Sequence, residues 1–328
     1  MVRKKIIDFL SNISFVNNYF SGIATIFFLH RVYPPEKNKL FPNENMKVSP
    51  EFLEEFILKL KAKGYEFISI DRLYEILQNK EKVKKQIVFT LDDGYKDNYK
   101  IAYPIFKKYN TPFVIYLTTS FPERNAYLWW YVIEDILIEN NEIILGSGQK
   151  FICKTKEQKN NIFLKIREMI KGFNKNEFQE RLNNLLKNYK IDWVKKCSEL
   201  TMDWEQIINI SKDNLCTIGG HTKNHYALNR LSETEIIEEV MGANKIIESK
   251  IGKKVEHFSY PFGTRNEITK RESNIVKKLG FKTAAITRYG NIYPEHKNYL
   301  ECLPRIMLTE GFDIKNVGKI RKNKIVIL

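Results

Sequence analysis

Two adjacent carboxylates, Asp92 and Asp93, stand where a short apolar run ends. The run extends from Ile87 to Leu91, and Gly94 follows the two aspartates. Apolar runs of this length bounded by turn residues are typical of buried strands, and α/β folds keep their chemistry at the carboxyl ends of such strands. By itself, an Asp-Asp-Gly sequence is more typical of a solvated turn, so a chemical role needs support from elsewhere in the chain.

Two imidazoles provide that support. His221 and His225 come four positions apart, after the apolar run 215–218 and a pair of glycines. A spacing of four predicts that both rings lie on one face of a helical turn. One carboxylate with two imidazoles is a mixed oxygen and nitrogen ligand set, which suits zinc or a similar divalent ion and leaves coordination positions for water.

The composition is that of a globular protein. The chain has 328 residues, of which 43% are hydrophobic and 13% aromatic, enough for a full hydrophobic core. Its four cysteines show no Cys-x-x-Cys spacing, so the sequence indicates neither a thiolate zinc site nor a disulfide framework. We expect Cys153, Cys197, Cys216 and Cys302 to be buried free thiols.

The net charge of +15 is compatible with three kinds of partner: nucleic acid, an anionic membrane surface or an acidic glycan. Nucleic-acid binding requires the cations to cluster on one face. The lysines are instead spread along the chain in pairs such as Lys84-Lys85 and Lys253-Lys254, without a dense tract. This distribution favours a solvated lysine-rich surface, and we expect no nucleic-acid partner.

The first 29 residues raise the question of targeting. Arg3, Lys4 and Lys5 resemble the basic start of a signal peptide, but Asp8 and several Ser and Asn residues interrupt the apolar stretch that follows. We therefore expect a cytoplasmic protein with no cleaved signal peptide and no membrane span. Peripheral contact of an amphipathic N-terminal segment with the anionic inner face of the membrane is an alternative.

The elements that position these residues alternate between strand and helix, which predicts an α/β fold. Ser49 followed by Pro50 is typical of a helix start, Asp71 is the expected cap of a short helix, and Ser232 with Glu235 forms a capping box. Strands are expected at 24–32, 65–70, 87–91, 113–117, 215–218, 257–260 and 282–286, and helices at 50–64, 71–77, 97–109, 204–210, 232–250 and 267–279.

Between about residues 122 and 200 the alternation stops. Charged, asparagine-rich segments at 163–170 and 178–186 are typical of amphipathic helices, so we expect one domain, 1–328, with a mainly helical insertion at about 122–200. The aromatic run Tyr127-Leu128-Trp129-Trp130-Tyr131 precedes these helices. It is most typical of a core, but exposed Trp and Tyr rings also stack on sugars, so a ligand cleft is a second interpretation.

Three motifs each follow an expected strand: Asp92-Asp93-Gly94, then His221-Thr222-x-x-His225, then Tyr260-Pro261-Phe262-Gly263. In this order they resemble the polysaccharide deacetylase family of carbohydrate esterases, also called the NodB-homology family, over most of residues 24–310. The resemblance implies a distorted (β/α)7 barrel that binds one divalent metal ion and removes acetyl groups from N-acetylated sugars. Zn²⁺ is the expected ion, with Co²⁺, Ni²⁺ or Mn²⁺ as alternatives.

The resemblance also implies roles for individual residues. Asp92 matches the catalytic base, and the backbone N–H of Phe262 matches the donor to the oxyanion. A metal held by three protein groups can bind water and the scissile carbonyl together, and a neighbouring carboxylate can take the proton of that water. The expected metal ligands are Asp93, His221 and His225, and the expected further contacts to substrate or oxyanion are Tyr95 and Tyr260.

The third motif departs from the family pattern, which has an arginine four residues before its glycine. Ser259 stands at that place here. In the branch that includes biofilm poly-N-acetylglucosamine deacetylases, a Leu-Pro-Arg segment near the end of the domain looks like the replacement, and this chain has such a segment at 303–305. We therefore expect Arg305 to hold and tune Asp92, with Arg265 as the weaker alternative.

The general acid is the second departure. The usual family histidine near the C-terminus has no counterpart, because the last histidine, His296, lies in a polar loop. His30, at the end of the first expected strand, resembles the permuted arrangement in which this motif comes first, and we expect it to protonate the leaving amine. Outside this context a single histidine at a strand end is interpreted as structural, as we interpret His257.

These expectations combine into one function, the metal-dependent release of acetate from an N-acetylated amino sugar. The sugar would belong to a surface glycan or to its lipid-linked or nucleotide-linked precursor, and the positive charge would suit a diphosphate-bearing substrate. The alternative is a non-catalytic glycan-binding protein on the same fold. Loss of Asp92, Asp93, His221 or His225 would mark that alternative, and none of them is lost.

Overall fold

Eight parallel strands form the main sheet of the computed structural model, which describes residues 22–318. They are β1 (Ala24–Leu29), β4 (Glu66–Phe67), β5 (Gln86–Asp93), β6 (Phe113–Leu117), β9 (Cys216–Gly220), β10 (His257–Ser259), β11 (Thr283–Ala285) and β12 (Ile306–Met307). Seven of them follow one another in the order β11, β10, β9, β6, β5, β1 and β12, and β4 pairs with the start of β5. This order repeats the order along the chain, as in a (β/α) barrel.

The segment 303–307 closes this sheet into a distorted barrel. At one edge, Ile306 of β12 pairs with Phe27 of β1. At the other edge, Leu303 forms a parallel bridge with Ala285 of β11, and its N–H donates to the carbonyl of the preceding residue of that strand at 2.8 Å. One short segment therefore joins the two edges of the sheet, which fixes the position of Arg305 between them.

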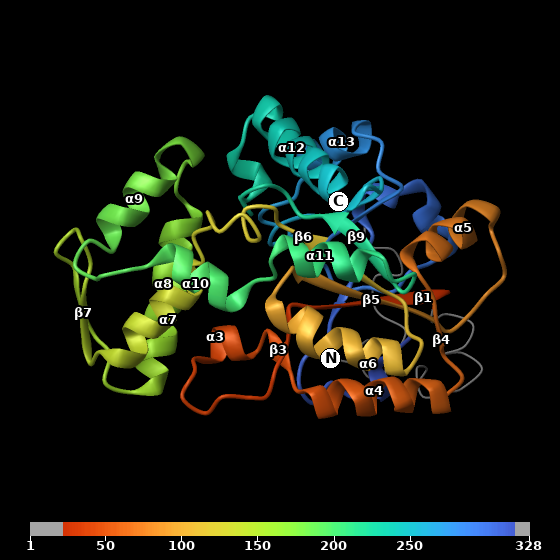
Figure 1. The fold of residues 1–328 in the computed structure, drawn as a ribbon, viewed down its shortest axis with the longest axis horizontal. Helices are drawn as coiled ribbons and strands as arrows, with labels where there is room; N and C mark the ends of the chain where they lie inside the picture. Colours follow the sequence, from red (N-terminus) through yellow and green to blue (C-terminus); the bar gives the residue numbers. More distant parts are fainter. Residues whose placement is uncertain (1–21, 319–328) are drawn as a thin grey trace, which may run out of the picture.

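Helices cover the outside of the barrel (Figure 1), and most of them connect one strand to the next. They are α4 (Pro50–Ala62), α5 (Ile70–Asn79), a π-helical turn (Asn98–Ala102) continued by α6 (Tyr103–Lys108), α11 (Trp204–Ser211), α12 (Glu233–Ile251) and α13 (Lys270–Lys278). A small lobe after β1 holds β2 (Arg31–Val32), α3 (Phe41–Glu44) and β3 (Lys47–Val48). Short 3-10 turns occupy Lys175–Glu177, Leu228–Arg230, Pro294–Asn298, Leu300–Cys302 and Ile314–Asn316.

The central strands are apolar because both of their faces are covered. β1, β5 and β6 are buried along their whole length. Their phenylalanines form the centre of the core, where the rings of Phe27 and Phe89 stack at 5.9 Å and Phe106 of α6 lies 5.4 Å from Phe89. A parallel sheet buried on both faces produces continuous apolar runs rather than alternating ones, which is the pattern that the sequence shows.

Residues 129–200 form a mainly helical region at one side of the barrel (Figure 1). It contains α7 (Trp129–Glu139), the antiparallel hairpin β7 (Glu142–Ile144) and β8 (Lys150–Ile152), α8 (Lys156–Lys171), α9 (Phe178–Leu185) and α10 (Trp193–Leu200). Its helices share a hydrophobic cluster around Val132, Phe163 and Leu182. The helices expected at 163–170 and 178–186 are confirmed, whereas the division into one domain with an insertion at about 122–200 stays a prediction.

Two helix starts differ from expectation because a hydroxyl group caps them. α5 begins after Ser69, whose Oγ accepts the N–H of Arg72 at 3.1 Å, so Asp71 lies inside the helix and does not cap it. α13 begins only at Lys270, because Thr269 forms a capping box there. The caps expected at Ser49 and Ser232 are confirmed.

Within residues 22–318, no helix combines the length and the apolar character needed to cross a bilayer. The expectations about an N-terminal segment, a signal peptide and membrane contact concern mainly residues 1–21, which lie outside the described residues, and they stay predictions. The four cysteines are buried free thiols, as expected.

Candidate active site

β5 delivers Asp92 and Asp93 to the carboxyl end of the barrel, and both carboxylates are buried. The backbone turns sharply here, since Asp93 has φ 78° and Gly94 has φ 89°. A Cβ on Gly94 would lie 2.6 Å from the side chain of Leu117, so only glycine fits this turn. The Asp-Asp-Gly sequence is thus the end of a buried strand and not a solvated turn.

Asp92 is held by Arg305. Nη1 of the guanidinium donates to Oδ1 at 2.8 Å, and Nη2 donates to Oδ2 at 2.7 Å. The remaining donors reach Thr90 Oγ1 at 3.0 Å, Ser259 Oγ at 2.9 Å and the carbonyl of Ile286 at 3.2 Å. The arginine is fully buried, and its guanidinium bonds the residue that replaces the usual motif arginine.

The paired hydrogen bonds from Arg305 determine the charge of the Asp92 carboxylate. Burial works to raise the pKa of Asp92, but the adjacent Arg305 more than offsets it and lowers the pKa below its ordinary value. Asp92 is therefore ionised at neutral pH, as a base must be. Arg265, the alternative holder, is exposed and has no described contact with Asp92.

The two histidines lie on a loop, so the expected helical turn is wrong. After β9 the chain continues without helix through His221 to Ala227, and Thr222 and His225 adopt positive φ angles of 66° and 58°. The Thr222 side chain stabilises this loop by accepting the N–H of His225 at 3.0 Å. The spacing of four still brings the rings together, with centroids 5.0 Å apart, because the loop folds back on itself.

Asp93, His221 and His225 form a cluster in which one ligand atom of each lies within 4.8 Å of the others. Asp93 Oδ1 is 3.4 Å from Nε2 of His221 and 3.3 Å from Nε2 of His225. The Nδ1 atom of His221 lies 2.7 Å from the carbonyl of Ser259, so Nδ1 carries the proton and Nε2 presents its lone pair to the cluster. The ring of His225 packs against Trp130 and Phe262 instead.

The donor set of this cluster fits a divalent cation. Within the described residues Asp93 Oδ1 is buried and accepts no hydrogen bond, which is costly unless another partner binds it. Burial works to lower the pKa of His221, but Asp93 and Asp92 together raise it above its ordinary value, whereas burial lowers the pKa of His225 to about 4. His225 is therefore neutral at pH 7, and together with the unbonded Asp93 oxygen it offers the oxygen and nitrogen donors that a divalent ion binds.

Phe262 lies in a tight turn beside the cluster. Its φ of 61° is unusual for a residue with a Cβ, and Gly263 N–H donates across it to the carbonyl of Pro261 at 2.7 Å. In the described part of the chain the N–H of Phe262 has no acceptor. Residues 22–318 contain eight positive-φ residues other than glycine, and four of them, namely Asp93, Thr222, His225 and Phe262, gather at this site, as strained residues do at functional sites.

His30 follows β1 and lines the same cleft as Asp92 and Asp93. Its Nδ1 is buried without a partner among the described residues, and burial lowers the pKa of its ring below the ordinary value. Its backbone is held from the π-helical turn Asn98–Ala102, because Asn98 Nδ2 donates to the His30 carbonyl at 2.9 Å. Sequence reasoning missed Asn98, although it stands only five residues after Asp93.

Only one of the two expected tyrosines reaches the cleft. Tyr95 lines it, and its hydroxyl accepts Trp130 Nε1–H at 3.1 Å. Tyr260 does not line it. Its ring packs against Phe258 and its hydroxyl donates to the carbonyl of Glu301 at 2.9 Å, so the expectation that its side chain contacts substrate is wrong. His257 begins β10 and does not line the cleft, and its Nδ1 bonds Thr283 at 2.8 Å, as a structural residue does.

The cleft has a volume of about 410 Å³, and helices α7 and α8 of the helical region line one side of it. Trp129, Trp130 and Tyr131 of α7 line it and also contribute to a core, so the core interpretation is confirmed and a role in binding a ligand stays a prediction. Arg167 and Lys171 of α8 also face it. They were missed because their only sequence signal is a spacing of four, which many exposed helix residues share.

Comparisons with known proteins bear on the family and the fold. The family model described as polysaccharide deacetylase matches residues 79–284. A putative polysaccharide deacetylase of Bacillus subtilis (strain 168), YxkH, is 32% identical over 74 residues. That match covers 22% of this chain and about a quarter (26%) of the relative.

Solved structures share the fold over most of the chain. The deacetylase PplD of Streptococcus pyogenes, solved in complex with acetate, has a TM-score of 0.60 at 18% identity and covers 92% of this chain and 98% of its own. IcaB of Ammonifex degensii has a TM-score of 0.55 at 17% identity, covering 88% and 92%. These likenesses confirm the expected NodB-type α/β barrel. With the family model matching well over half of the sequence and the barrel closed around the aspartate and histidine motifs, the chain belongs to the polysaccharide deacetylase family.

Proposed function

We propose that this protein hydrolyses the acetamido group of an N-acetylated amino sugar with the help of one divalent metal ion. The observation that carries the proposal is the convergence of three features on one cleft. These are the ionised Asp92 locked by Arg305, the Asp93 cluster with two imidazoles, and the Phe262 turn with its free N–H. Family membership supports the same class of reaction.

Asp93, His221 and His225 would hold the metal, with Zn²⁺ first among the candidates. When bound, such an ion lowers the pKa of a coordinated water and polarises a carbonyl group. Asp92 sits directly beside Asp93 and, being ionised, can accept the proton of the attacking water. Because both oxygens of Asp92 are engaged by Arg305, the carboxylate keeps one orientation throughout the reaction.

Two further groups complete the reaction. The N–H of Phe262 can donate to the oxygen that becomes negatively charged when the carbonyl is attacked. The His30 ring lines the cleft at the end of β1 and can donate a proton to the leaving amine. Burial makes its imidazolium form a stronger acid than free histidine. The water oxygen bonds to the acetyl carbon, the C–N bond breaks, and the products are acetate and an amino sugar whose ammonium group carries both hydrogens of the water.

The substrate is proposed to be a surface glycan or its lipid-linked or nucleotide-linked precursor. The aromatic wall of α7 supports a sugar, since sugar rings stack on Trp and Tyr faces. As a separate proposal, drawn from the sequence, the protein works in the cytoplasm.

The test is acetate release from a panel of N-acetylated oligosaccharides by protein loaded with Zn²⁺, and in parallel with Co²⁺, Ni²⁺ or Mn²⁺. Asp92→Asn keeps the shape of the side chain but removes the base, and we expect acetate release to fall by roughly 10²–10⁴-fold. Asp313→Asn, a change of the same kind at a surface turn, should leave the rate unaltered. Glycan binding with no acetate release from any substrate would favour the non-catalytic alternative instead.

A further inference from the structure

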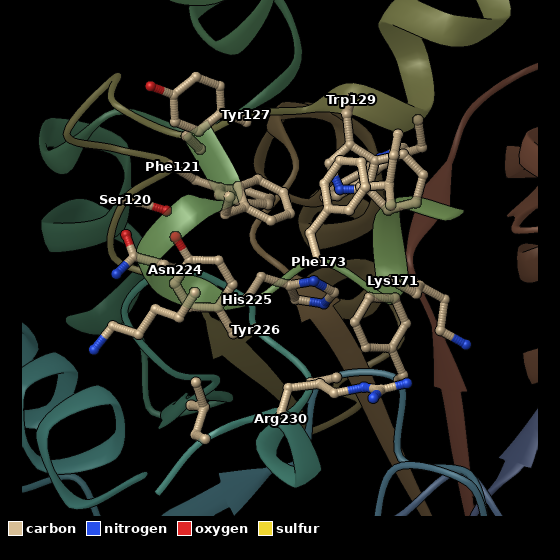
Figure 2. Close-up of a pocket in the computed structure, with 18 of the residues that line it drawn as sticks. Ser120, Phe121, Tyr127, Trp129, Lys171, Phe173, Asn224, His225, Tyr226 and Arg230 are labelled. Atoms are coloured by element: carbon tan, nitrogen blue, oxygen red, sulfur yellow. The ribbon is translucent and has the colours of Figure 1, made fainter. Parts of the chain in front are cut away.

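A second, smaller cavity opens beside the metal-binding cluster (Figure 2). Its volume is about 60 Å³. It lies between the helical region and the loops at the end of β6 and β9, and it shares Trp129, Trp130, Lys171, His225 and Phe262 with the main cleft. The two cavities are therefore neighbouring parts of one groove, and we call the smaller one the side pocket.

The size of the side pocket limits what can enter it. Cavities that hold a whole ligand measure roughly 300–1,000 Å³, and the main cleft of about 410 Å³ falls in that range. The side pocket, at about 60 Å³, is several times smaller than the main cleft. It can therefore accept a substituent of a sugar but not a further sugar ring.

Apart from Asp92 and Asp93, the lysines and arginines that line the groove give it positive charge alone. Every charged side chain that lines the side pocket is a cation, namely Lys171, Lys175 and Arg230. The main cleft is lined by the two aspartates and by two cations, Arg167 and Lys171. Among the described residues that line the groove, Asp92 and Asp93 are the only carboxylates. The glutamates that pair with Lys171 and Lys175 lie outside the lining.

The cations differ in how far their charge is already neutralised. Lys171 is paired with the buried Glu267 at 2.7 Å. Lys175 forms two loose pairs, 3.5 Å from the exposed Glu238 and 3.9 Å from Glu235. Arg230 forms no ion pair with any described carboxylate, so its guanidinium is the main uncompensated charge at the side pocket.

A buried hydroxyl group also lacks a partner there. Ser120 lines the side pocket with 1% of its surface exposed, and its Oγ has no hydrogen-bond partner among the described residues. Figure 2 shows Ser120 and Asn224 on one side of the pocket, with Arg230 and Lys171 along other sides. A buried polar group without a partner indicates a missing ligand or water.

We propose that the groove binds an anionic glycan. The acetamido sugar lies at the metal-binding cluster, and a phosphate or carboxylate group on that sugar or on its neighbour enters the side pocket. There Arg230 and Lys175 bind its charge and the Ser120 hydroxyl donates a hydrogen bond to it. This inference rests on the proposed deacetylase function and adds the chemical class of its substrate.

The test uses three oligosaccharides that share one N-acetylhexosamine backbone: a neutral one, one that carries a single phosphate, and one that carries a single uronic acid. KM and kcat for acetate release are measured with the metal-loaded wild type, Arg230→Gln and Ser120→Ala. The control is Arg72→Gln, the same loss of charge on α5, where the residue lines neither cavity.

We expect KM of the wild type to be about tenfold lower for at least one anionic substrate, because charge-assisted hydrogen bonds contribute most to such a preference. Arg230→Gln should remove most of that preference and leave the neutral substrate unchanged, and Arg72→Gln should change neither. The better of the two anionic substrates identifies phosphate or carboxylate as the ligand. Equal KM values for neutral and anionic substrates in the wild type, or an equal effect of Arg230→Gln on all three, would overturn the inference.

A binding measurement separates this inference from the proposed function. The phosphorylated and neutral oligosaccharides are titrated calorimetrically into Asp92→Asn, with and without Arg230→Gln. Tighter binding of the anionic substrate that depends on Arg230 supports the inference even where no acetate is released. Acetate release without any anionic preference in either measurement leaves the deacetylase proposal standing and refutes the anionic substrate.

Discussion

The guanidinium of Arg305 binds both carboxylate oxygens of Asp92, although 213 positions separate the two residues. Closure of the barrel makes this contact, because the segment that carries Arg305 joins β1 to β11. The guanidinium also bonds Ser259, which stands where the family pattern has its arginine. The positive charge that binds Asp92 therefore comes from the segment that closes the barrel.

Arg305→Lys tests whether this pair sets the activity. A lysine keeps one charge but cannot bond both oxygens, so we expect a loss of roughly 100-fold in kcat/KM. Because Arg305 lowers the pKa of Asp92, its loss raises that pKa. Less base is then ionised at low pH, and the acidic limb of the pH–rate profile should move to higher pH. Arg265→Lys serves as the control, and an unshifted limb in Arg305→Lys would contradict the assignment.

Asn98→Ala tests how His30 is held. The change removes the donor to the His30 carbonyl at 2.9 Å, while the neighbouring Asp97 still binds Val32 N–H at 3.1 Å and Arg31 Nε at 2.7 Å. We expect kcat to fall about tenfold with KM unchanged, as for a misplaced proton donor. In the background of His30→Gln the same change should add little. Equal effects in both backgrounds would assign Asn98 a role unrelated to His30.

Metal addition should stabilise the wild type and not Asp93→Asn. Binding to the folded state alone adds about 2.7 kcal/mol at one hundred times the Kd, which corresponds to roughly 5 °C in Tm. Asparagine tolerates the positive φ of residue 93, so the variant should fold. The measurement is thermal unfolding with Zn²⁺ and after chelation, repeated with Co²⁺, Ni²⁺ and Mn²⁺. An equal rise in Asp93→Asn would place the metal elsewhere.

His296 should make the protein sensitive to acid. Burial lowers its pKa from 6.5 to about 4, so between these values the unfolded chain binds a proton that the folded chain does not. The contribution of neutral His296 to the free energy of unfolding is therefore fully present above pH 6.5. It is lost as the pH decreases toward 4, and the loss amounts to about 3 kcal/mol at most. His296→Gln removes the titration and keeps an acceptor for the N–H of Tyr293, which Nδ1 now accepts at 2.9 Å.

The measurement is the free energy of unfolding by urea at pH 7 and pH 4.5. We expect the variant to lose less stability between the two pH values than the wild type does. Parallel losses in the two proteins would show that His296 contributes nothing to the acid sensitivity.

Much of the fold follows from local patterns. The apolar runs at 87–91 and 113–117 are strands β5 and β6, and the caps at Ser49 and Ser232 begin α4 and α12. Such features depend on neighbours within a few positions, so the sequence predicts them. Where two capping residues stood close together, as at Ser69 and Asp71, the local pattern chose the wrong one.

The chain by itself determined which residue types carry the chemistry: two aspartates, two histidines four apart, and an arginine after Leu-Pro. Only the tertiary structure decided their geometry. It replaced the expected helical turn of His221 and His225 with a loop, brought Arg305 rather than Arg265 to Asp92, and turned the Tyr260 ring into the core. It also placed Arg230 beside a cavity. The reason is that spacing along the chain reports local periodicity, whereas these contacts depend on how the barrel closes and on what the helical region covers.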